Sequence, residues 1–309
     1  MSGHIVHIGY HKTGTTWFQR VWYPRVRNLC YLHRKRAREA FLHDGAFGWD
    51  VERARRILAP MQERGIILCE EDLSGNIHSG GLHGFLSRAV AERIHATLPD
   101  AHIVAFIRNQ PDMIASVYRQ YVKEGGTHGV NRYLHPERHL SESGFSFMKT
   151  PLFDFAHFDY LPLLDHYAAL FGRERVHVFP FEAFLADPPA FMADYAARLG
   201  LDVDTAGLSY RETNTAYRAP VMYAARFLYL FCRGDVGDKR WLIDVPLLYK
   251  YGSRLLKTIN RLPFLGRPVP TQRLLGAANL REIQERYAES NRRLGNAFGL
   301  DLERHGYPL

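Results

Sequence analysis

A short motif near the N-terminus combines residue types that bind anions. Residues 9–16 have the sequence Gly-Tyr-His-Lys-Thr-Gly-Thr-Thr and follow an apolar run at residues 4–8. A strand, a glycine-containing turn and a helix start bring several backbone N–H groups to one point, where the helix dipole adds positive charge. Lys12 adds a full charge, and Thr15 and Thr16 offer hydroxyl donors. The motif predicts a cradle for a phosphate-like group, although Lys12 precedes the second glycine and so departs from the Walker A pattern.

A second motif pairs an arginine with a serine further along the chain. Arg108 follows the apolar run 102–107, and Ser116 falls in a helix expected at about 111–123. An arginine at a strand end and a serine on the adjoining helix can hold a second phosphate, the arginine with two hydrogen bonds. Because an arginine before a proline-initiated helix is common, this motif predicts a phosphate site only in combination with the first.

Three consecutive acids follow another apolar run, residues 66–69. One of them could serve as a general base that takes a proton from an attacking hydroxyl. Side chains alternate along a strand, so Glu70 and Glu71 are expected to point in opposite directions, and only one of them can face a bound anion. Two alternatives stay open: the acids could cap the next turn or pair with nearby arginines, and His11 in the first motif could be the base instead.

The elements that must position these residues alternate between strands and helices. The apolar runs predict buried strands at residues 4–8, 66–69, 102–107 and 176–179. Helices are expected to open at 15–19 and to cover about 111–123 and 182–199, the last ending at Gly200. This order predicts an α/β fold, with a central parallel sheet flanked by helices on both faces. All three motifs then follow carboxyl ends of strands, where such sheets bind ligands.

The composition indicates a globular protein. Of the 309 residues, 46% are hydrophobic and 23% are charged, which excludes disordered and fibrous classes. No run reaches the ~18 apolar residues that a membrane span needs, and no signal peptide is visible. Cys30, Cys69 and Cys232 are widely separated, which favours a reducing, cytoplasmic location. The whole chain is expected to form one domain, with irregular insertions at about 124–160 and 233–272.

The net charge of +8 is concentrated in two segments. Residues 20–38 hold seven Lys and Arg and no Asp or Glu, and residues 238–273 hold eight Lys and Arg against two Asp. These segments could be solvated basic faces, or they could create a positive field around a site for an anionic ligand or acceptor. Within the second segment, residues 247–257 could rest on a membrane surface, although their Leu and Tyr residues also suit a core.

The two phosphate motifs together resemble those of sulfotransferases that use 3′-phosphoadenosine 5′-phosphosulfate (PAPS), above all the bacterial members. Arg108 and Ser116 match the arginine and serine that hold the 3′-phosphate in that family, and Glu71 matches the register of an acid in related bacterial sequences. Residues 179–184 and 287–294 are similar to further recurrent stretches, so the resemblance spans nearly the whole chain. The family loop that holds the 5′-phosphosulfate is similar to His11, Lys12, Thr13, Gly14, Thr15 and Thr16.

The resemblance implies a P-loop-like sulfotransferase architecture and in-line transfer of a sulfuryl group from PAPS to an acceptor hydroxyl or amine. The product would be 3′-phosphoadenosine 5′-phosphate (PAP), and no metal would be required. In such a reaction Lys12 stabilises the charge that develops on the leaving phosphate oxygen, and Glu71 or His11 takes the acceptor proton. The expected acceptor is a carbohydrate or lipid-linked glycan, for example an anionic glycan or glycolipid. No nucleic-acid partner is expected, peripheral contact with the inner face of a membrane stays open, and the oligomeric state is not indicated.

Two other functions compete with this interpretation. In a P-loop kinase or nucleotide hydrolase, the acids after residues 66–69 would act as a Walker B acid that holds Mg²⁺, so dependence on a metal separates the two. In a module that binds polyanions, the two basic segments would bind the ligand without turnover, and moderate salt would abolish binding. The missing Gly-Lys-Ser/Thr sequence disfavours the first, and the absence of a nucleic-acid motif disfavours the second.

Overall fold

A computed structural model of the chain describes residues 3–59, 64–139, 152–210 and 216–309. The described chain divides into two compact units. Unit 1 comprises Met1–Asn109, Ala156–Thr213 and Tyr287–Leu309, and unit 2 comprises Gln110–Phe155 and Asn214–Arg286. The expectation of a single domain stays a prediction beside this division, and each unit is described by itself.

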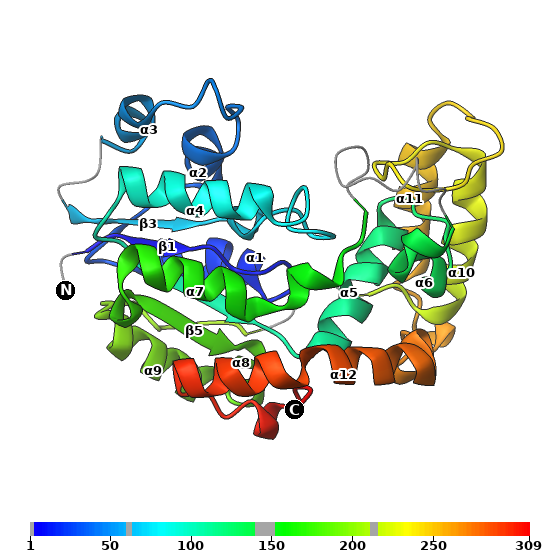
Figure 1. The fold of residues 1–309 in the computed structure, drawn as a ribbon. Coiled ribbons are helices and arrows are strands. Elements are labelled where there is room, and N and C mark those ends of the chain that lie inside the picture. Colours follow the sequence, from blue (N-terminus) through cyan, green and yellow to red (C-terminus); the bar gives the residue numbers. More distant parts are fainter. Residues whose placement is uncertain (1–2, 60–63, 140–151, 211–215) are drawn as a thin grey trace. The chain divides into compact units, whose positions relative to one another are not determined.

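Unit 1 is built around a five-stranded parallel sheet (Figure 1). The strand order is β2-β3-β1-β4-β5, and every pair of neighbours runs in parallel. The α/β class with a central parallel sheet is therefore confirmed, and the four predicted strands are present. The strands are β1 (Ile5–His7), β2 (Cys30–Tyr31), β3 (Ile66–Cys69), β4 (His102–Ile107) and β5 (Val176–Pro180).

Helices follow the strands in unit 1 and make up the regular structure described in unit 2. In unit 1 they are α1 (Thr15–Trp17), α2 (Arg34–Phe41), α3 (Val51–Leu58), α4 (Phe85–Thr97), α7 (Tyr160–Phe171), α8 (Phe181–Ala186) and α9 (Pro188–Leu199). In unit 2 they are α5 (Gln110–Lys123), α6 (Val130–Leu134), α10 (Ala219–Leu228) and α11 (Leu248–Ile259), while α12 (Thr271–Phe298) begins in unit 2 and ends in unit 1.

One helical expectation is wrong. The helix expected over residues 182–199 is two helices, because α8 ends at Ala186 and α9 begins at Pro188. The Asp187 carboxylate accepts a hydrogen bond from the backbone N–H of Ala190 at 3.1 Å and so caps the second helix. Proline at the first position of a helix loses nothing by its missing N–H. The end of α9 is as expected, since Gly200 has a left-handed φ of 62°.

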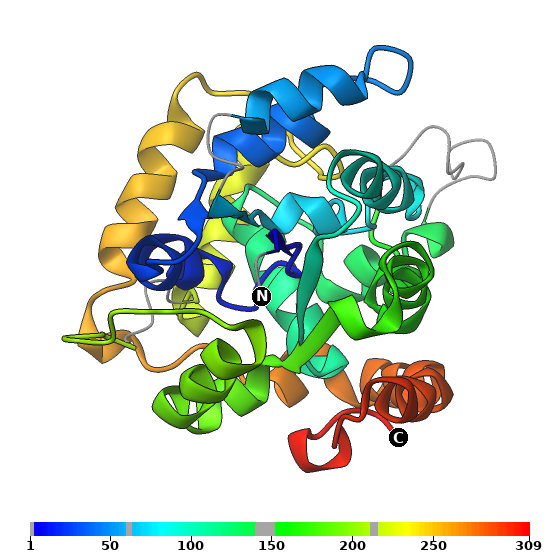
Figure 2. The same ribbon diagram turned by 90° about the vertical axis from the view of Figure 1, so that its left-hand side faces the viewer.

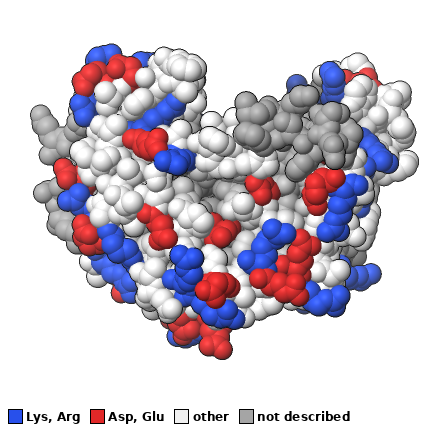
Figure 3. All heavy atoms as spheres, in the orientation of Figure 1, with Lys and Arg blue, Asp and Glu red and all other residues white. Residues whose placement is uncertain are grey.

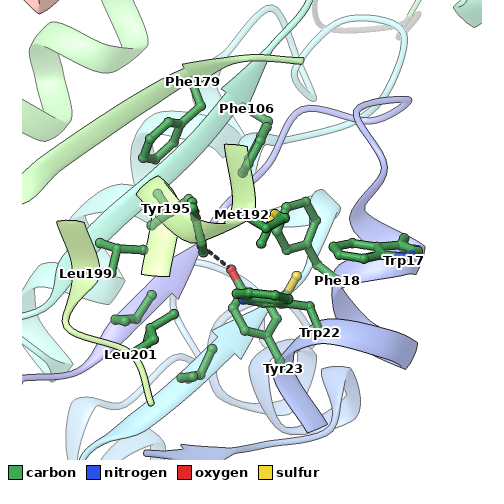
Figure 4. Packing of buried hydrophobic residues seen from close by; sticks show 14 of the residues in the cluster. Trp17, Phe18, Trp22, Tyr23, Phe106, Phe179, Met192, Tyr195, Leu199 and Leu201 are labelled. Atoms are coloured by element: carbon green, nitrogen blue, oxygen red, sulfur yellow. Dashed lines mark hydrogen bonds between the residues drawn. The ribbon is translucent and has the colours of Figure 1, made fainter. Parts of the chain in front are cut away.

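One hydrophobic cluster of the unit 1 core lies against one face of the sheet. Trp17 and Phe18, from the helical turns after the first motif, pack with Met192 and Tyr195 of α9 against alternate strand residues (Figure 4). The Tyr23 and Tyr195 hydroxyls lie 2.7 Å apart and hydrogen-bond inside this core. Helices α4 and α7 contact each other on the opposite side of the strands (Figures 1 and 2). A sheet covered on both faces gives the motifs at its carboxyl edge a rigid base.

Unit 2 contains the second predicted insertion and part of the first. Residues 233–272 lie inside it, with α11 as their regular element. Within the segment 124–160, residues 140–151 lie outside the described residues. The described residues of this segment that belong to unit 2 include the α-helix α6. In unit 2, α10 contacts both α5 and α11.

Candidate functional site

The register of the sheet brings the predicted motifs of unit 1 to one edge. Strand β1 lies between β3 and β4, and its last residue, His7, is in register with both Cys69 of β3 and Val104 of β4. Because the strands are parallel, the segments after their carboxyl ends emerge on the same side. The first motif, the three acids and Arg108 therefore follow the carboxyl ends of neighbouring strands; that they follow strand ends was predicted from the sequence, and that the strands are neighbours was not.

The loop between β1 and α1 has an unusual backbone. Its φ values are left-handed at Gly9 (32°), Lys12 (67°) and Gly14 (84°). A left-handed lysine is uncommon, and such strained residues concentrate at functional sites. At Gly14 a Cβ atom would lie 2.9 Å from the Phe181 ring, so a side chain there would have to displace the ring.

The threonines of this loop differ in their hydrogen bonds. The Thr13 hydroxyl is buried and donates to the carbonyl oxygen of Tyr10 at 2.5 Å, so it holds the loop together. The Thr15 hydroxyl is also buried, but it has no hydrogen-bond partner among the described residues. Leaving a buried hydroxyl unsatisfied costs about 1–3 kcal/mol. Thr16 follows it in the first turn of α1 and is half-buried.

Arg108 joins the second motif to the first. It directly follows β4, and its Nη1 donates a hydrogen bond to the backbone oxygen of Lys12 at 3.3 Å. Its guanidinium also lies over the Phe181 ring, 5.7 Å from the centroid. The hydroxyl of Tyr160 donates to the backbone oxygen of Arg108 at 2.6 Å. The structure thus places Arg108 in direct contact with the loop between β1 and α1, and the sequence had predicted a phosphate-binding role for each.

A buried network that the sequence did not assign holds the backbone next to Arg108. The backbone N–H and the side-chain amide of Asn109 both donate to Oε1 of Glu182, each at 2.9 Å. The Tyr307 hydroxyl donates to Oε2 of the same carboxylate at 3.1 Å. Burial, followed by the charge of Glu182, raises the pKa of Tyr307 well above its usual value. Glu182 stands in the stretch 179–184 that resembles the family, which was the available signal, but its pairing with Asn109 and Tyr307 was not predictable.

Glu70 is the centre of an ion-pair network. It is 0% exposed, and its two oxygens accept hydrogen bonds from Arg34 at 2.7 and 2.8 Å and from Arg38 at 2.9 and 3.3 Å. Burial alone raises the pKa of a carboxyl, but the hydrogen bonds from Arg34 and Arg38 outweigh it and lower the pKa of Glu70. Two arginines of the basic segment 20–38 therefore pair with this acid, as one of the alternatives from the sequence proposed.

Glu71 occupies a different environment from Glu70. Its side chain is 18% exposed and contacts Nη2 of Arg34 at 3.2 Å through Oε1. Its other oxygen, Oε2, accepts a hydrogen bond from Gln19 Nε2 at 3.2 Å, and the same Nε2 donates to the backbone oxygen of Cys69. The glutamine comes from the π-helical turn Phe18–Trp22, directly after α1. Glu71 is thus oriented by the helical segment that follows the loop between β1 and α1.

His11 forms a pair with the third acid. Its Nε2 lies 3.3 Å from Oδ1 of Asp72 and 3.1 Å from the backbone oxygen of Gly75. Because both partners are acceptors, Nε2 carries a proton, and in the neutral form of the ring Nδ1 then carries the lone pair. Burial, and then the charge of His11, lower the pKa of the neighbouring His78 to about 4. His157 is affected in the same way and has a pKa of about 3.

Ser116 lies in unit 2, on α5, and is half-buried. Arg108 belongs to unit 1, so their joint grip on one phosphate stays a prediction. The prediction that no metal is required likewise stays open, although no group of three or more His, Cys, Asp or Glu among the described residues could hold a metal ion. In the described part of the chain, no helix has both the length and the apolar character to cross a bilayer.

Comparison with known proteins gives solved structures only. No protein-family model matches the chain, and the search of curated proteins returns no match. A sulfotransferase from Alicyclobacillus acidocaldarius aligns with a TM-score of 0.48 and 20% identity over 69% of this chain and 87% of its own. Mouse sulfotransferase SULT7A1 complexed with PAP aligns with a TM-score of 0.44 and 14% identity over 99% of this chain and 89% of its own. The sulfotransferase domain from the curacin biosynthetic pathway aligns with a TM-score of 0.38 and 12% identity over 90% of this chain and 98% of its own. All three are sulfotransferases, the family that the sequence motifs resemble.

Proposed function

We propose that this protein transfers a sulfuryl group from PAPS to a hydroxyl or amine of an acceptor. The observation that carries the proposal is the hydrogen bond from Arg108 to the backbone of Lys12. It brings Arg108 of the second motif into contact with the first motif, which supports a site for a ligand with two phosphate-like groups. A nucleotide with phosphates at both the 5′ and 3′ positions presents two such groups at a fixed separation.

The residues at the site fit the two ends of this donor. Lys12, Thr15 and Thr16 would hold the 5′-phosphosulfate, and the buried Thr15 hydroxyl that lacks a protein partner supports this assignment. Arg108 and Ser116 would hold the 3′-phosphate, the arginine with two charge-assisted hydrogen bonds. Thr13 and Gly14 act indirectly, since one holds the loop by a hydrogen bond and the other admits the Phe181 ring.

The chemistry asks for charge stabilisation and for a base. Transfer of a sulfuryl group resembles phosphoryl transfer, in which positioning and electrostatics supply most of the catalysis. Lys12 would stabilise the negative charge that develops on the leaving phosphate oxygen as the attacking oxygen or nitrogen bonds to sulfur. The proton of the attacking group must leave at the same time, which requires an acceptor beside the loop.

Glu71 is the base that we propose. Glu70 is unsuited because it is fully buried and its oxygens are held by two arginines. Glu71 is partly exposed, and a carboxylate with about four acceptor sites can receive a further hydrogen bond beside those from Gln19 and Arg34. His11 is the alternative base, because the hydrogen bonds of its Nε2 leave Nδ1 as a proton acceptor. We further propose a carbohydrate or lipid-linked glycan as the acceptor and a cytoplasmic location.

Donor specificity tests the proposal. The protein is incubated with a panel of carbohydrate acceptors and either PAPS labelled in its sulfuryl group or ATP labelled in its terminal phosphate, with and without a chelator. Transfer of label from PAPS that the chelator leaves unchanged is the expected result, and Lys12→Ala serves as the inactive control. Transfer or hydrolysis of the ATP label that the chelator abolishes would replace the proposal by a P-loop kinase or hydrolase.

A further inference from the structure

Large apolar side chains gather on the surface of unit 2. Sixteen large hydrophobic residues are exposed among the described residues, and eleven of them fall between residues 223 and 264. Soluble proteins expose single apolar residues freely, but a concentrated group of them marks an interaction surface. The eleven residues are Tyr223, Phe227, Trp241, Leu242, Ile243, Val245, Leu247, Tyr251, Leu255, Leu262 and Phe264, and together they are called the α10–α11 surface.

Helix α11 carries two parallel stripes on its outer side. Tyr251 and Leu255 are spaced four residues apart and are 56% and 61% exposed, so they form one apolar stripe, and the exposed Leu247 directly precedes the helix. Lys250, Arg254 and Lys257 are exposed and spaced four and three residues apart, so they form a basic stripe next to it. The buried residues of the helix, among them Gly252 and Leu256, occupy the remaining side. The helix therefore presents apolar and cationic groups to the solvent together.

The elements that contact α11 carry further exposed apolar side chains. Helices α10 and α11 lie side by side in unit 2 (Figure 1), and they approach so closely that a Cβ on Gly252 would lie 2.7 Å from the Leu228 side chain. On α10, the exposed Phe227 ring packs edge-on against the Phe231 ring, and the two ring centroids lie 5.4 Å apart. The backbone N–H of Val245 then donates to the Phe231 oxygen at 3.0 Å. These contacts link α10 to the exposed segment that leads into α11.

The charge of this region is of one sign. Residues 245–273 contain six Lys and Arg and no Asp or Glu. By contrast, the face of the molecule in Figure 3 shows basic and acidic residues interspersed over its described part. A second copy of this chain would bring two cationic segments together, which opposes self-association through the α10–α11 surface. An anionic partner that is apolar beneath its charges would match both stripes.

We propose that the α10–α11 surface docks on an anionic lipid bilayer. A helix that lies in the plane of the interface inserts its apolar side chains and keeps Lys and Arg at the headgroups. Tyr251 and Trp241 add amphipathic rings of the type found at membrane interfaces. The described helices do not span a bilayer, so the contact is peripheral. It does not depend on sulfuryl transfer, because the residues that carry it lie outside the proposed catalytic site.

Vesicle binding of the full chain tests this proposal. Co-sedimentation is measured with vesicles of phosphatidylcholine alone and with vesicles of equal parts phosphatidylcholine and phosphatidylglycerol, each at low and high salt. Binding to the anionic vesicles at low salt and its loss at high salt are expected. Neutralising the basic stripe by Lys250→Gln, Arg254→Gln and Lys257→Gln should weaken binding on the order of 100-fold, at about fivefold for each charge near the surface.

A matched pair of variants separates the surface from general effects of charge. Tyr251→Glu with Leu255→Glu should abolish binding, whereas Phe47→Glu with Leu185→Glu, which makes the same change at exposed apolar residues of unit 1, should leave it unchanged. Thermal melting confirms that each variant is folded. Equal binding to neutral and anionic vesicles, no binding at low salt, or equal losses in both pairs would overturn the proposal. A dimer in sedimentation without lipid that Tyr251→Glu with Leu255→Glu dissociates would assign the surface to self-association instead.

Discussion

Replacing Glu70 by glutamine should destabilise the protein because the carboxylate is the shared partner of two arginines. Removing one member of a buried ion pair costs about 3–5 kcal/mol. The side chains of Arg34 and Arg38 are 29% and 36% exposed, so water solvates them in part, and a loss of about 2–3 kcal/mol in the free energy of unfolding is expected. At roughly 2–4 °C for each kcal/mol, the melting temperature should fall by roughly 4–12 °C.

The pH dependence gives this prediction a second signature. The pKa of Glu70 is lower in the folded protein than in the unfolded chain. Its contribution to stability is therefore complete above the unfolded pKa of about 4.3, and it is lost as the pH falls through the folded pKa. The difference in stability between the wild type and Glu70→Gln should be constant near neutral pH and shrink below about pH 4.

Denaturant unfolding at several pH values measures both effects. The control is Glu92→Gln, which breaks an exposed pair with Arg88 in which both side chains are at least half exposed. That change should cost within about 0.5 kcal/mol. Two results would show that the ion-pair network around Glu70 does not stabilise the fold as its geometry indicates. One is a loss in the free energy of unfolding for Glu70→Gln no larger than for Glu92→Gln, and the other is a loss that persists unchanged at acidic pH.

Three further predictions concern catalysis and donor binding. Lys12→Ala should lower turnover by on the order of 10³ and weaken PAP binding, and wild-type turnover would remove the loop from the mechanism. Glu71→Gln should lower turnover by on the order of 10²–10⁴ and remove the acidic limb of the pH–rate profile, with PAP affinity nearly unchanged. If Glu71→Gln leaves turnover unchanged and His11→Asn lowers it, His11 is the base. Thr15→Val should weaken PAP binding roughly 10- to 100-fold in calorimetry while the unliganded protein melts no lower than the wild type, because the variant removes an unsatisfied buried hydroxyl. Unchanged PAP affinity would show that this hydroxyl has no part in binding.

Patterns local in sequence were predictable, and pairings between distant residues were not. Short apolar runs followed by the motifs gave the four longer strands and the edge at which they end. Strand β2 was missed because two residues carry no periodicity. The break at Asp187 had a signal, an aspartate followed by prolines, but the apolar pattern on either side favoured one continuous helix.

The electrostatic partners at the acids show the same limit. The sequence could place Glu70 and Glu71 directly after a buried strand. That their side chains point in opposite directions stays a prediction, because Arg34 contacts both carboxylates. The sequence could not show that Arg34 and Arg38, more than thirty residues away, bind Glu70 from one face of α2. It also could not show that His11 contacts Asp72. Such contacts depend on how loops from three neighbouring strands meet, which no spacing in the sequence encodes.

The most direct measurement is calorimetric titration of the wild type, Arg108→Ala and Lys12→Ala with PAP and with AMP, which lacks the 3′-phosphate. If the two motifs form one donor site, the wild type binds one PAP and binds it more tightly than AMP, by roughly 10- to 100-fold for a charged hydrogen-bonded contact. Arg108→Ala should remove most of that difference, and Lys12→Ala should weaken both ligands. Equal affinity of the wild type for PAP and AMP, or equal losses of both ligands in Arg108→Ala, would contradict a donor site built from Lys12 and Arg108.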